Sequence, residues 1–231
     1  MDGVSDVAPE QLGADAAWVE QRAGIGAPDP RFIRRLRSMS ALDEAPHVQP
    51  DDRAAWRAWL EANHATARGV WLVTWRPRSG RVGLDYEAAI EEALCFGWVD
   101  STGGRVDDER GKLYFAPRKA RSVWAASNKA RVERLTREGR MTPAGLAAIE
   151  RAKASGSWET LDSVERLEVP ADLAHALEAE PQAAVNFAAF PPSARKMALG
   201  SIALARRPET RAARIRSIVE AAARNERPAA G

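Results

Sequence analysis

The chain has 231 residues, of which 45% are hydrophobic and 29% are charged, and its formal net charge is +2. This is the length and composition of a globular protein, and it excludes disorder over the whole chain. The nearly balanced charge excludes a global field strong enough to indicate nucleic acid as the partner.

The first 48 residues differ in composition from the rest of the chain. They offer short helices at Ala14–Ala23 and Arg31–Met39, with too little apolar surface to offset the entropy of ordering them. We therefore predict a flexible N-terminal extension over residues 1–48. Met39, which is followed by a polar lead-in to the first strong helix, is an alternative translation start.

The next signals predict a helix and then a strand. Asp51 or Asp52 is suited to cap a helix that carries Trp56 and Leu60 on one face. The segment Val70–Trp75 is rich in β-branched and aromatic residues, which predicts a strand.

A second helix and two short strands follow. Asp85 is a suitable N-cap for a helix whose buried stripe contains Tyr86 and Leu94. The segments Trp98–Asp100 and Leu113–Ala116 read as strands separated by a charged loop.

After Pro117 the pattern is helical. Ser122 or Ser127 is a candidate cap for a helix that reaches Glu138, and Thr142 for a helix with Leu146 on its inner face. Three prolines predict further helices near residues 170–179, 192–205 and 208–224; they are Pro170, Pro192 and Pro208.

This order of elements predicts an α+β protein. We expect a small antiparallel sheet in the N-terminal half packed by helices, and an all-helical C-terminal part. The predicted domains are the extension at residues 1–48, an α+β core at 49–165 and a helical module at 166–227.

Several kinds of chemistry find no support in the residues. The three histidines are far apart and Cys95 is the only cysteine, so we expect no metal site. There is no phosphate-binding glycine loop and no nucleophile elbow, and we expect no cofactor. Cys95 lies between Leu94 and Phe96 with no nearby cation in the sequence, which favours a small buried hydrophobe over a reactive thiolate.

Cysteine use and hydropathy indicate the compartment. A single cysteine fits a reducing environment. No apolar run approaches the roughly 18 residues that span a bilayer, and Met1–Gly13 lacks the apolar region of a signal peptide. We therefore expect a cytoplasmic protein without membrane insertion.

Two regions combine features that suit ligand binding. Trp124 is surrounded by Arg118, Lys119 and Asn128, a set that could bind an anion or a peptide or could simply be a packed tryptophan with solvated cations. In the C-terminal part, residues 195–227 include nine basic and three acidic residues.

Part of this basic excess forms one helical face. Arg207, Arg211 and Arg214 share it and could attract phosphate groups. We favour instead a solvated face paired with acidic residues of the same fold, because no nucleic-acid motif accompanies it. The acidic residues available for this pairing are Glu87, Glu91, Glu92, Asp107, Asp108 and Glu109.

Several motifs in order resemble those of the YdeI/OmpD-associated, or bacteriocin-protection, family. They are Glu91–Asp100 (EEALCFGWVD), Phe115–Lys119 (FAPRK), Trp124 with Asn128–Val132, Glu138–Gly145 (EGRMTPAG), Pro170–Leu173 (PADL) and Glu209–Arg211 (ETR). The resemblance extends over about residues 53–224. Ala125 departs from it, because the family usually has serine after the tryptophan.

The resemblance implies a bacterial stress-protection protein and does not imply a reaction or a cofactor. Our leading hypothesis is a non-catalytic protein that binds a small anionic ligand or a peptide, with a protein partner as a further option. The site would comprise Asp100, Arg118, Lys119, Trp124, Asn128 and Arg140. In the alternative, Asp100 acts as an acid or base in an enzyme of unknown reaction.

Overall fold

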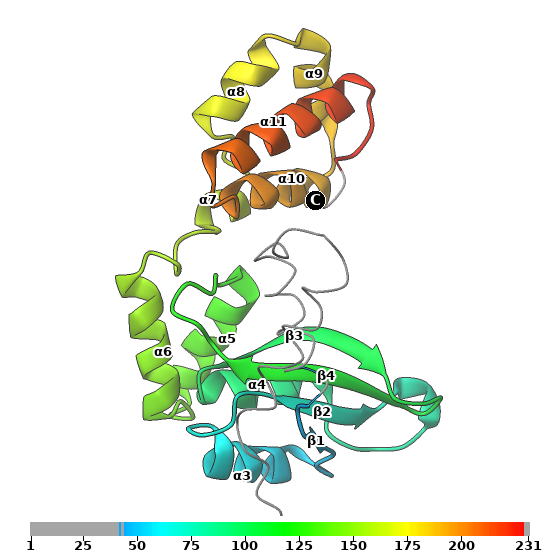
Figure 1. Cartoon of the computed structure of the whole chain (residues 1–231), viewed down its shortest axis with the longest axis vertical. Helices are drawn as coiled ribbons and strands as arrows, with labels where there is room; N and C mark the ends of the chain where they lie inside the picture. The colour runs from blue at the N-terminus through cyan, green and yellow to red at the C-terminus, as the bar shows by residue number, and fades with distance from the viewer. Residues whose placement is uncertain (1–41, 43, 229–231) are drawn as a thin grey trace, which may run out of the picture. The chain divides into compact units, whose positions relative to one another are not determined.

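The computed structural model describes residue 42 and residues 44–228. The chain contains both strands and helices as far as Pro117, and every described element after that residue is a helix (Figure 1). The strands are β1 (His47–Val48), β2 (Val70–Trp75), β3 (Trp98–Arg105) and β4 (Arg110–Pro117). The helices up to residue 154 are α3 (Arg53–Asn63), α4 (Tyr86–Cys95), α5 (Ala126–Arg137) and α6 (Pro143–Ala154), with a 3₁₀ turn at Pro77–Ser79. The remaining helices are α7 (Asp162–Glu165), α8 (Ala171–Glu178), α9 (Pro181–Ala189), α10 (Pro192–Ala203) and α11 (Pro208–Ala223).

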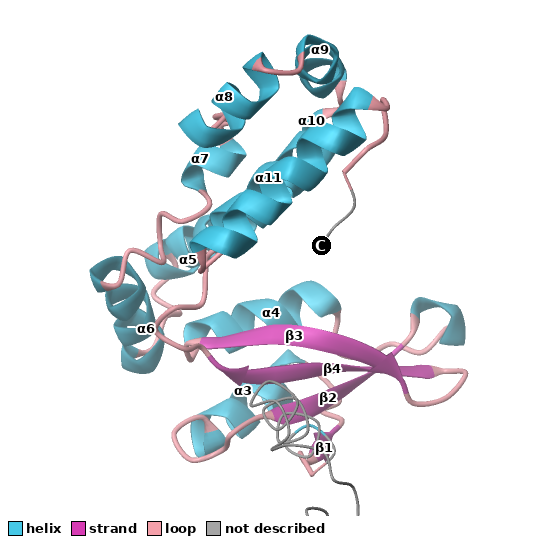
Figure 2. Ribbon diagram, turned by 45° about the horizontal axis from the view of Figure 1, so that its top comes forward, coloured by secondary structure: helices cyan, strands magenta, loops and turns pink. Residues whose placement is uncertain are grey.

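The strands form one sheet in the order β1-β2-β4-β3 (Figures 1 and 2). β4 pairs antiparallel with β2 and β3, whereas β1 pairs parallel with β2, so the sheet is mixed and not purely antiparallel. The predicted bounds of β2 are confirmed. β3 and β4 are longer than predicted, because their pairing continues through much of the segment expected to be a loop. β1 was not predicted, since two residues carry no alternating pattern.

The predicted α+β class is confirmed, and so are most of the helix starts. Side-chain caps are present at Asp52, Asp85 and Thr142, which accept hydrogen bonds from the backbone N–H groups of Ala55, Ala88 and Gly145. The prediction that Ser122 or Ser127 caps α5 is wrong. That helix begins after Ala125, whose side chain has no group that could accept a hydrogen bond.

The residues predicted to be buried in the middle of the helices are buried, but two residues predicted to be buried in first turns are exposed. Trp56 and Leu60 are fully buried in α3, and Leu94 is 1% exposed in α4. Tyr86 and Leu146 were expected to face inward, but they are 61% and 42% exposed. Both lie in the first turn of their helices, where the apolar stripe extends past the surface against which the helix packs.

One hydrophobic cluster joins the sheet to the helices of the N-terminal half. Trp56 is at its centre, with its indole N–H donating to the carbonyl oxygen of Ala89 at 3.1 Å and its ring 5.6 Å from that of Phe115. α3, α4 and the inner face of the sheet therefore form a single core, and the C-terminal end of α4 is rigidly held.

The end of α4 is tied closely to the start of α6. Gly97 has a positive φ of 73°, which ends the helix as predicted and turns the chain into β3. The Cys95 carbonyl oxygen accepts hydrogen bonds from the Thr142 hydroxyl at 2.7 Å and from its N–H at 3.1 Å. Gly145 of α6 lies directly against this carbonyl group.

Gly145→Ala is therefore expected to destabilise the protein by about 1–3 kcal/mol. A Cβ atom at Gly145 would overlap the carbonyl oxygen of Cys95 and lie 2.8 Å from its carbonyl carbon, and backbone atoms cannot turn aside. The measurement is thermal unfolding followed by circular dichroism.

Gly200→Ala is the matched control for this substitution, because Gly200 is also inside a helix. Its nearest neighbour to an added Cβ is Val164 at 3.9 Å. Helix propensity should then make the control neutral or stabilising by up to about 1 kcal/mol. Equal effects of the two substitutions would contradict the close approach of α4 and α6.

A second hydrophobic cluster is built by α7–α11. Among its most buried members are Leu173, Ala183, Ile202 and Ala222. The helices expected after Pro170, Pro192 and Pro208 are confirmed, while α9 was not predicted as a separate helix.

The two hydrophobic clusters share no residue, but the domain boundaries given above stay predictions. Three predictions lie outside the described residues. They are the helices expected at 14–23 and 31–39, the flexible extension at 1–48 apart from its last residues, and the translation start at Met39.

Candidate functional site

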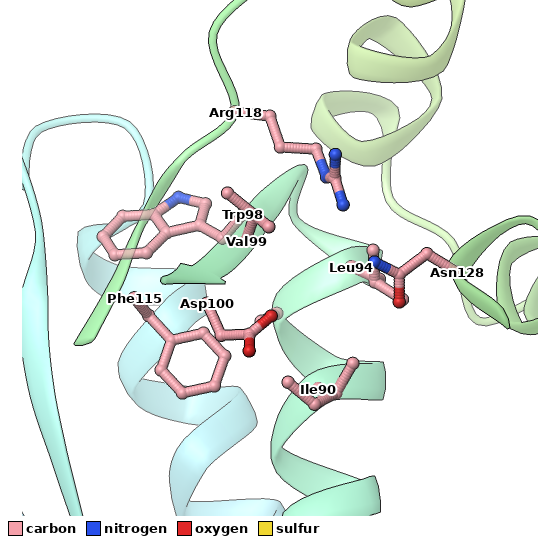
Figure 3. Close-up of a pocket in the computed structure, with 9 residues that line it drawn as sticks. Ile90, Leu94, Trp98, Val99, Asp100, Phe115, Arg118 and Asn128 are labelled. Atoms are coloured by element: carbon pink, nitrogen blue, oxygen red, sulfur yellow. The ribbon is translucent and has the colours of Figure 1, made fainter. Parts of the chain in front are cut away.

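Three of the predicted site residues converge on one recess where α4, β3 and the first turn of α5 meet. They are Asp100, Arg118 and Asn128, and apolar side chains line the rest. Figure 3 shows the carboxylate, the guanidinium and the amide turned toward the same space, beside Ile90 and Leu94. The recess is so narrow that no water-sized sphere fits in it. A ligand can therefore enter only when a side chain at the mouth turns aside.

Arg118 provides the cation of the recess. It follows the last residue of β4, and its backbone N–H donates to the carbonyl oxygen of Gly97 at 2.9 Å, which fixes where the side chain starts. Its guanidinium lies 3.8 Å from the centre of the Trp124 ring and donates to the carbonyl oxygen of Val123 at 3.1 Å. Arg118 is only 6% exposed, and its Nε–H has no hydrogen-bond acceptor among the described residues.

The electrostatics of this arginine are unfavourable. Burial lowers the pKa of Arg118 to about 10, and the negative charge of Asp100 opposes this effect only in part. No ion pair within 4.0 Å joins Arg118 to a carboxylate in the part of the chain that the structure describes. A buried cation without a paired anion is costly, because water is removed and little replaces it.

Asp100 provides the anion. It lies on β3 where the pairing with β4 shifts register, so its side chain is placed by an irregularity and not by the regular pleat. The hydroxyl of Tyr86 is beside it: partial burial and then the charge of Asp100 raise the pKa of Tyr86. Tyr86 is largely exposed and is not among the residues that line the recess.

Asn128 is oriented by its own helix. Its side-chain oxygen accepts a hydrogen bond from Arg131 at 3.1 Å, and Arg131 is in turn held by Glu87 through two bonds of 2.7 Å. The amide nitrogen of Asn128 is thereby left to face the recess (Figure 3). Tyr86, Glu87 and Arg131 were not predicted as site residues, although Arg131 follows Asn128 by three residues, a spacing that brings side chains together on a helix.

The other predicted site residues lie elsewhere. Trp124 is 1% exposed, with Arg118 on its face and the ring of Trp158 at 4.9 Å, so no face is open for a ligand to stack on. Lys119 is exposed to solvent. Arg140 is not in the recess but contacts Glu91 and Glu92.

Glu91 and Glu92 form the centre of a second charged group, which we call the Glu91/Glu92 network. Its four arginines are Arg53, Arg57, Arg134 and Arg140. Glu92 is 1% exposed and accepts from Arg53 at 2.6 Å, from Arg57 at 2.8 Å and from Arg140. For Glu91, burial alone would raise the pKa, but hydrogen bonds from Arg134 and Arg53 lower it. The network connects α3, α4 and α5, so its role is in holding these helices together.

Cys95 lies beside this network. It is fully buried, as predicted. Burial, followed by the charge of Glu92, raises the pKa of its thiol to about 11, although Arg140 and Arg57 act in the opposite direction. These two cations are distant from Cys95 in the sequence and were not predicted as its neighbours. The thiol is nevertheless kept protonated, which does not suit a nucleophile.

Comparison with protein families identifies two segments of the chain. Residues 166–225 match the model of the family described as bacteriocin-protection, YdeI or OmpD-associated. Residues 48–148 match a different model, described as a domain of unknown function (DUF8412). No curated protein and no solved structure matches the chain.

The two matches divide the motifs. The PADL and ETR motifs lie in the OmpD-associated segment, whereas the longer motifs between residues 91 and 145 lie in the domain of unknown function. The recess, including Asp100, Arg118 and Asn128, is thus also in the domain of unknown function.

In the OmpD-associated segment the predicted basic face is partly occupied. Arg211 makes a two-bond ion pair with Asp172, at 2.6 and 2.9 Å, and Arg214 donates to the carbonyl oxygen of Ser201. Arg207 is exposed. The acidic residues expected to pair with this face pair instead with cations of the N-terminal half, as Glu87 does with Arg131. Among the described helices, none is both long enough and apolar enough to cross a bilayer.

Proposed function

We propose that this protein is a cytoplasmic binding protein that takes a small carboxylate-bearing ligand into the recess at Arg118, and that it serves in protection against bacteriocin-type peptides. The observation that carries the binding proposal is Arg118, which is 6% exposed and whose guanidinium has, among the described residues, neither an acceptor for its Nε–H nor a carboxylate partner. The family match of residues 166–225 supports the protective role.

The contrast with the Glu91/Glu92 network supports a binding role for Arg118 over a purely structural one. The other arginines that contact buried groups of the N-terminal half, such as Arg53 and Arg134, each have a carboxylate within hydrogen-bond distance. Arg118 is more deeply buried than either and has none. A carboxylate is one of the groups that a guanidinium pairs with strongly, through two parallel hydrogen bonds, and the amide nitrogen of Asn128 adds a second donor on the same side.

A resistance assay tests this function. A strain lacking the gene is challenged with cationic antimicrobial peptides and complemented with the wild type, Arg118→Met or Asn128→Ala. We expect the wild type to restore resistance and both variants to fail at equal protein levels. Lys119→Met, at the exposed neighbouring position, is the control and should behave as the wild type.

Full resistance in the Arg118→Met strain would overturn the proposal that the recess serves protection. Trp124 is not a suitable test position, because its side chain is 1% exposed and its removal would cost about 3–5 kcal/mol through the cavity that it leaves. Loss of resistance in that variant would report unfolding.

A further inference from the structure

Two opposite charges face the recess without neutralising each other. Arg118 and Asp100 are close enough for the carboxylate to influence the pKa of the guanidinium, yet no ion pair within 4.0 Å joins them in the described chain. Elsewhere in the same domain such neighbours do meet, as Arg131 and Glu87 do at 2.7 Å. The gap between Arg118 and Asp100 is therefore a place where a molecule with both charges would satisfy both partners.

The donors of the recess lie on one side of this gap. The Nε–H of Arg118 has no acceptor within residues 44–228, and the amide of Asn128 is turned by Arg131 so that its nitrogen faces inward. Two converging N–H donors, one of them charged, match the two oxygens of a carboxylate.

The acceptor lies on the other side. The carboxylate of Asp100 points into the recess from β3 (Figure 3), and no described lysine or arginine occupies the position opposite it within 4.0 Å. The neighbouring Tyr86 offers Asp100 only a neutral hydroxyl. An ammonium group is the ligand group that best satisfies such a carboxylate, because it supplies both charge and several donors.

The size of the recess limits what fits between the two sides. No water-sized sphere fits in the recess as it stands, so even a small ligand fits only after the lining side chains move apart. The smallest molecule that joins an ammonium to a carboxylate through one carbon is glycine. The apolar walls, Ile90, Leu94 and Phe115 among them, offer no further polar partner from their side chains.

We infer that the recess, in its proposed role as a carboxylate site, also binds the ammonium group of the same molecule, so that its ligand class is the free α-amino acid. Arg118 and Asn128 hold the carboxylate, and Asp100 holds the ammonium. This inference rests on the proposed function and narrows the ligand from an anion to a zwitterion.

Titration calorimetry on the full chain tests this inference with four probes: glycine, acetate, methylammonium and N-acetylglycine. A charge-assisted hydrogen bond contributes about 1.5–3 kcal/mol, so glycine should bind roughly 10- to 100-fold more tightly than acetate. N-acetylglycine, which lacks the ammonium, should lose this advantage, and methylammonium should bind weakly.

The variant Asp100→Asn separates the two charges. We expect it to lower the affinity for glycine by about 10- to 100-fold and to leave the affinity for acetate unchanged or higher, since a nearby negative charge is removed. Asp108→Asn, at a position 82% exposed, is the control and should change neither affinity.

The outcomes distinguish this inference from the proposed function. If the wild-type protein binds acetate as tightly as glycine, the inference of an amino-acid ligand is wrong, while the proposed carboxylate site is retained. The comparison needs no variant, so it holds even if Asp100→Asn fails to fold. Absence of binding for both glycine and acetate overturns the inference and the proposed function together.

Discussion

Replacing Glu92 with alanine is expected to lower the free energy of unfolding of the N-terminal half by about 3–5 kcal/mol. Glu92 is 1% exposed and accepts hydrogen bonds from Arg53, Arg57 and Arg140. Its removal leaves these guanidinium groups close together without the anion that neutralises them, and it opens a gap between α3 and α4. This substitution should be among the most damaging in the chain.

Urea unfolding followed by tryptophan fluorescence measures this effect. All eight tryptophans lie at or before residue 158, so their emission does not report directly on the helices α8–α11. Glu61→Ala is the control, because Glu61 pairs with Arg57 but is 58% exposed; such a pair contributes about 0–1 kcal/mol. A loss below about 1 kcal/mol for Glu92→Ala would show that the Glu91/Glu92 network does not hold the helices together.

The second large effect is expected on binding and not on stability. Arg118→Met should lower the affinity for acetate by about 10- to 100-fold, because it removes a charge-assisted hydrogen bond to the ligand. The free energy of unfolding should change by less than about 1 kcal/mol, although a buried charged residue is removed.

The near-neutral stability follows from two opposing contributions. Burial lowers the pKa of Arg118 to about 10, which corresponds to about 3 kcal/mol of cost to the charged form. Methionine removes this cost and fills similar space. The substitution also removes two stabilising contacts. The cation–π contact with Trp124 contributes about 2 kcal/mol when desolvated, and the hydrogen bond to the Val123 carbonyl contributes about 1 kcal/mol.

Urea unfolding and acetate titration on the same Arg118→Met preparation test this prediction. Lys119→Met is the control and should change neither quantity, because Lys119 is exposed. A loss of about 3 kcal/mol or more would make Arg118 a structural residue. In that case its function would be to support Trp124 and the turn after β4.

The sequence allowed prediction of what is local. The bounds of β2 and the caps Asp52, Asp85 and Thr142 depend on residues within a few positions of each other, and all are confirmed. The faces of the helices followed from periodicity, but Tyr86 shows where this fails, because the pattern does not reveal how far the packing surface extends.

What the sequence could not show is which charges meet. Asp100, Arg118 and Asn128 were grouped as neighbours of one strand–helix junction, and the structure places all three at one recess. Arg140 was grouped with them because it is in a motif, yet Glu91 and Glu92, nearly 50 residues earlier, attract it. Ion pairs across such separations depend on the packing of α3, α4 and α5, which no local pattern encodes.

The most direct test of the account is an acetate titration of the isotope-labelled protein, followed by nuclear magnetic resonance at the Nε–H of Arg118. Its signal is assigned by its absence from the Arg118→Met spectrum. Because this Nε–H has no acceptor in the structure, we predict that its resonance moves downfield and saturates with sodium acetate but not with sodium chloride. A resonance that stays in place throughout the acetate titration would contradict a carboxylate site at Arg118.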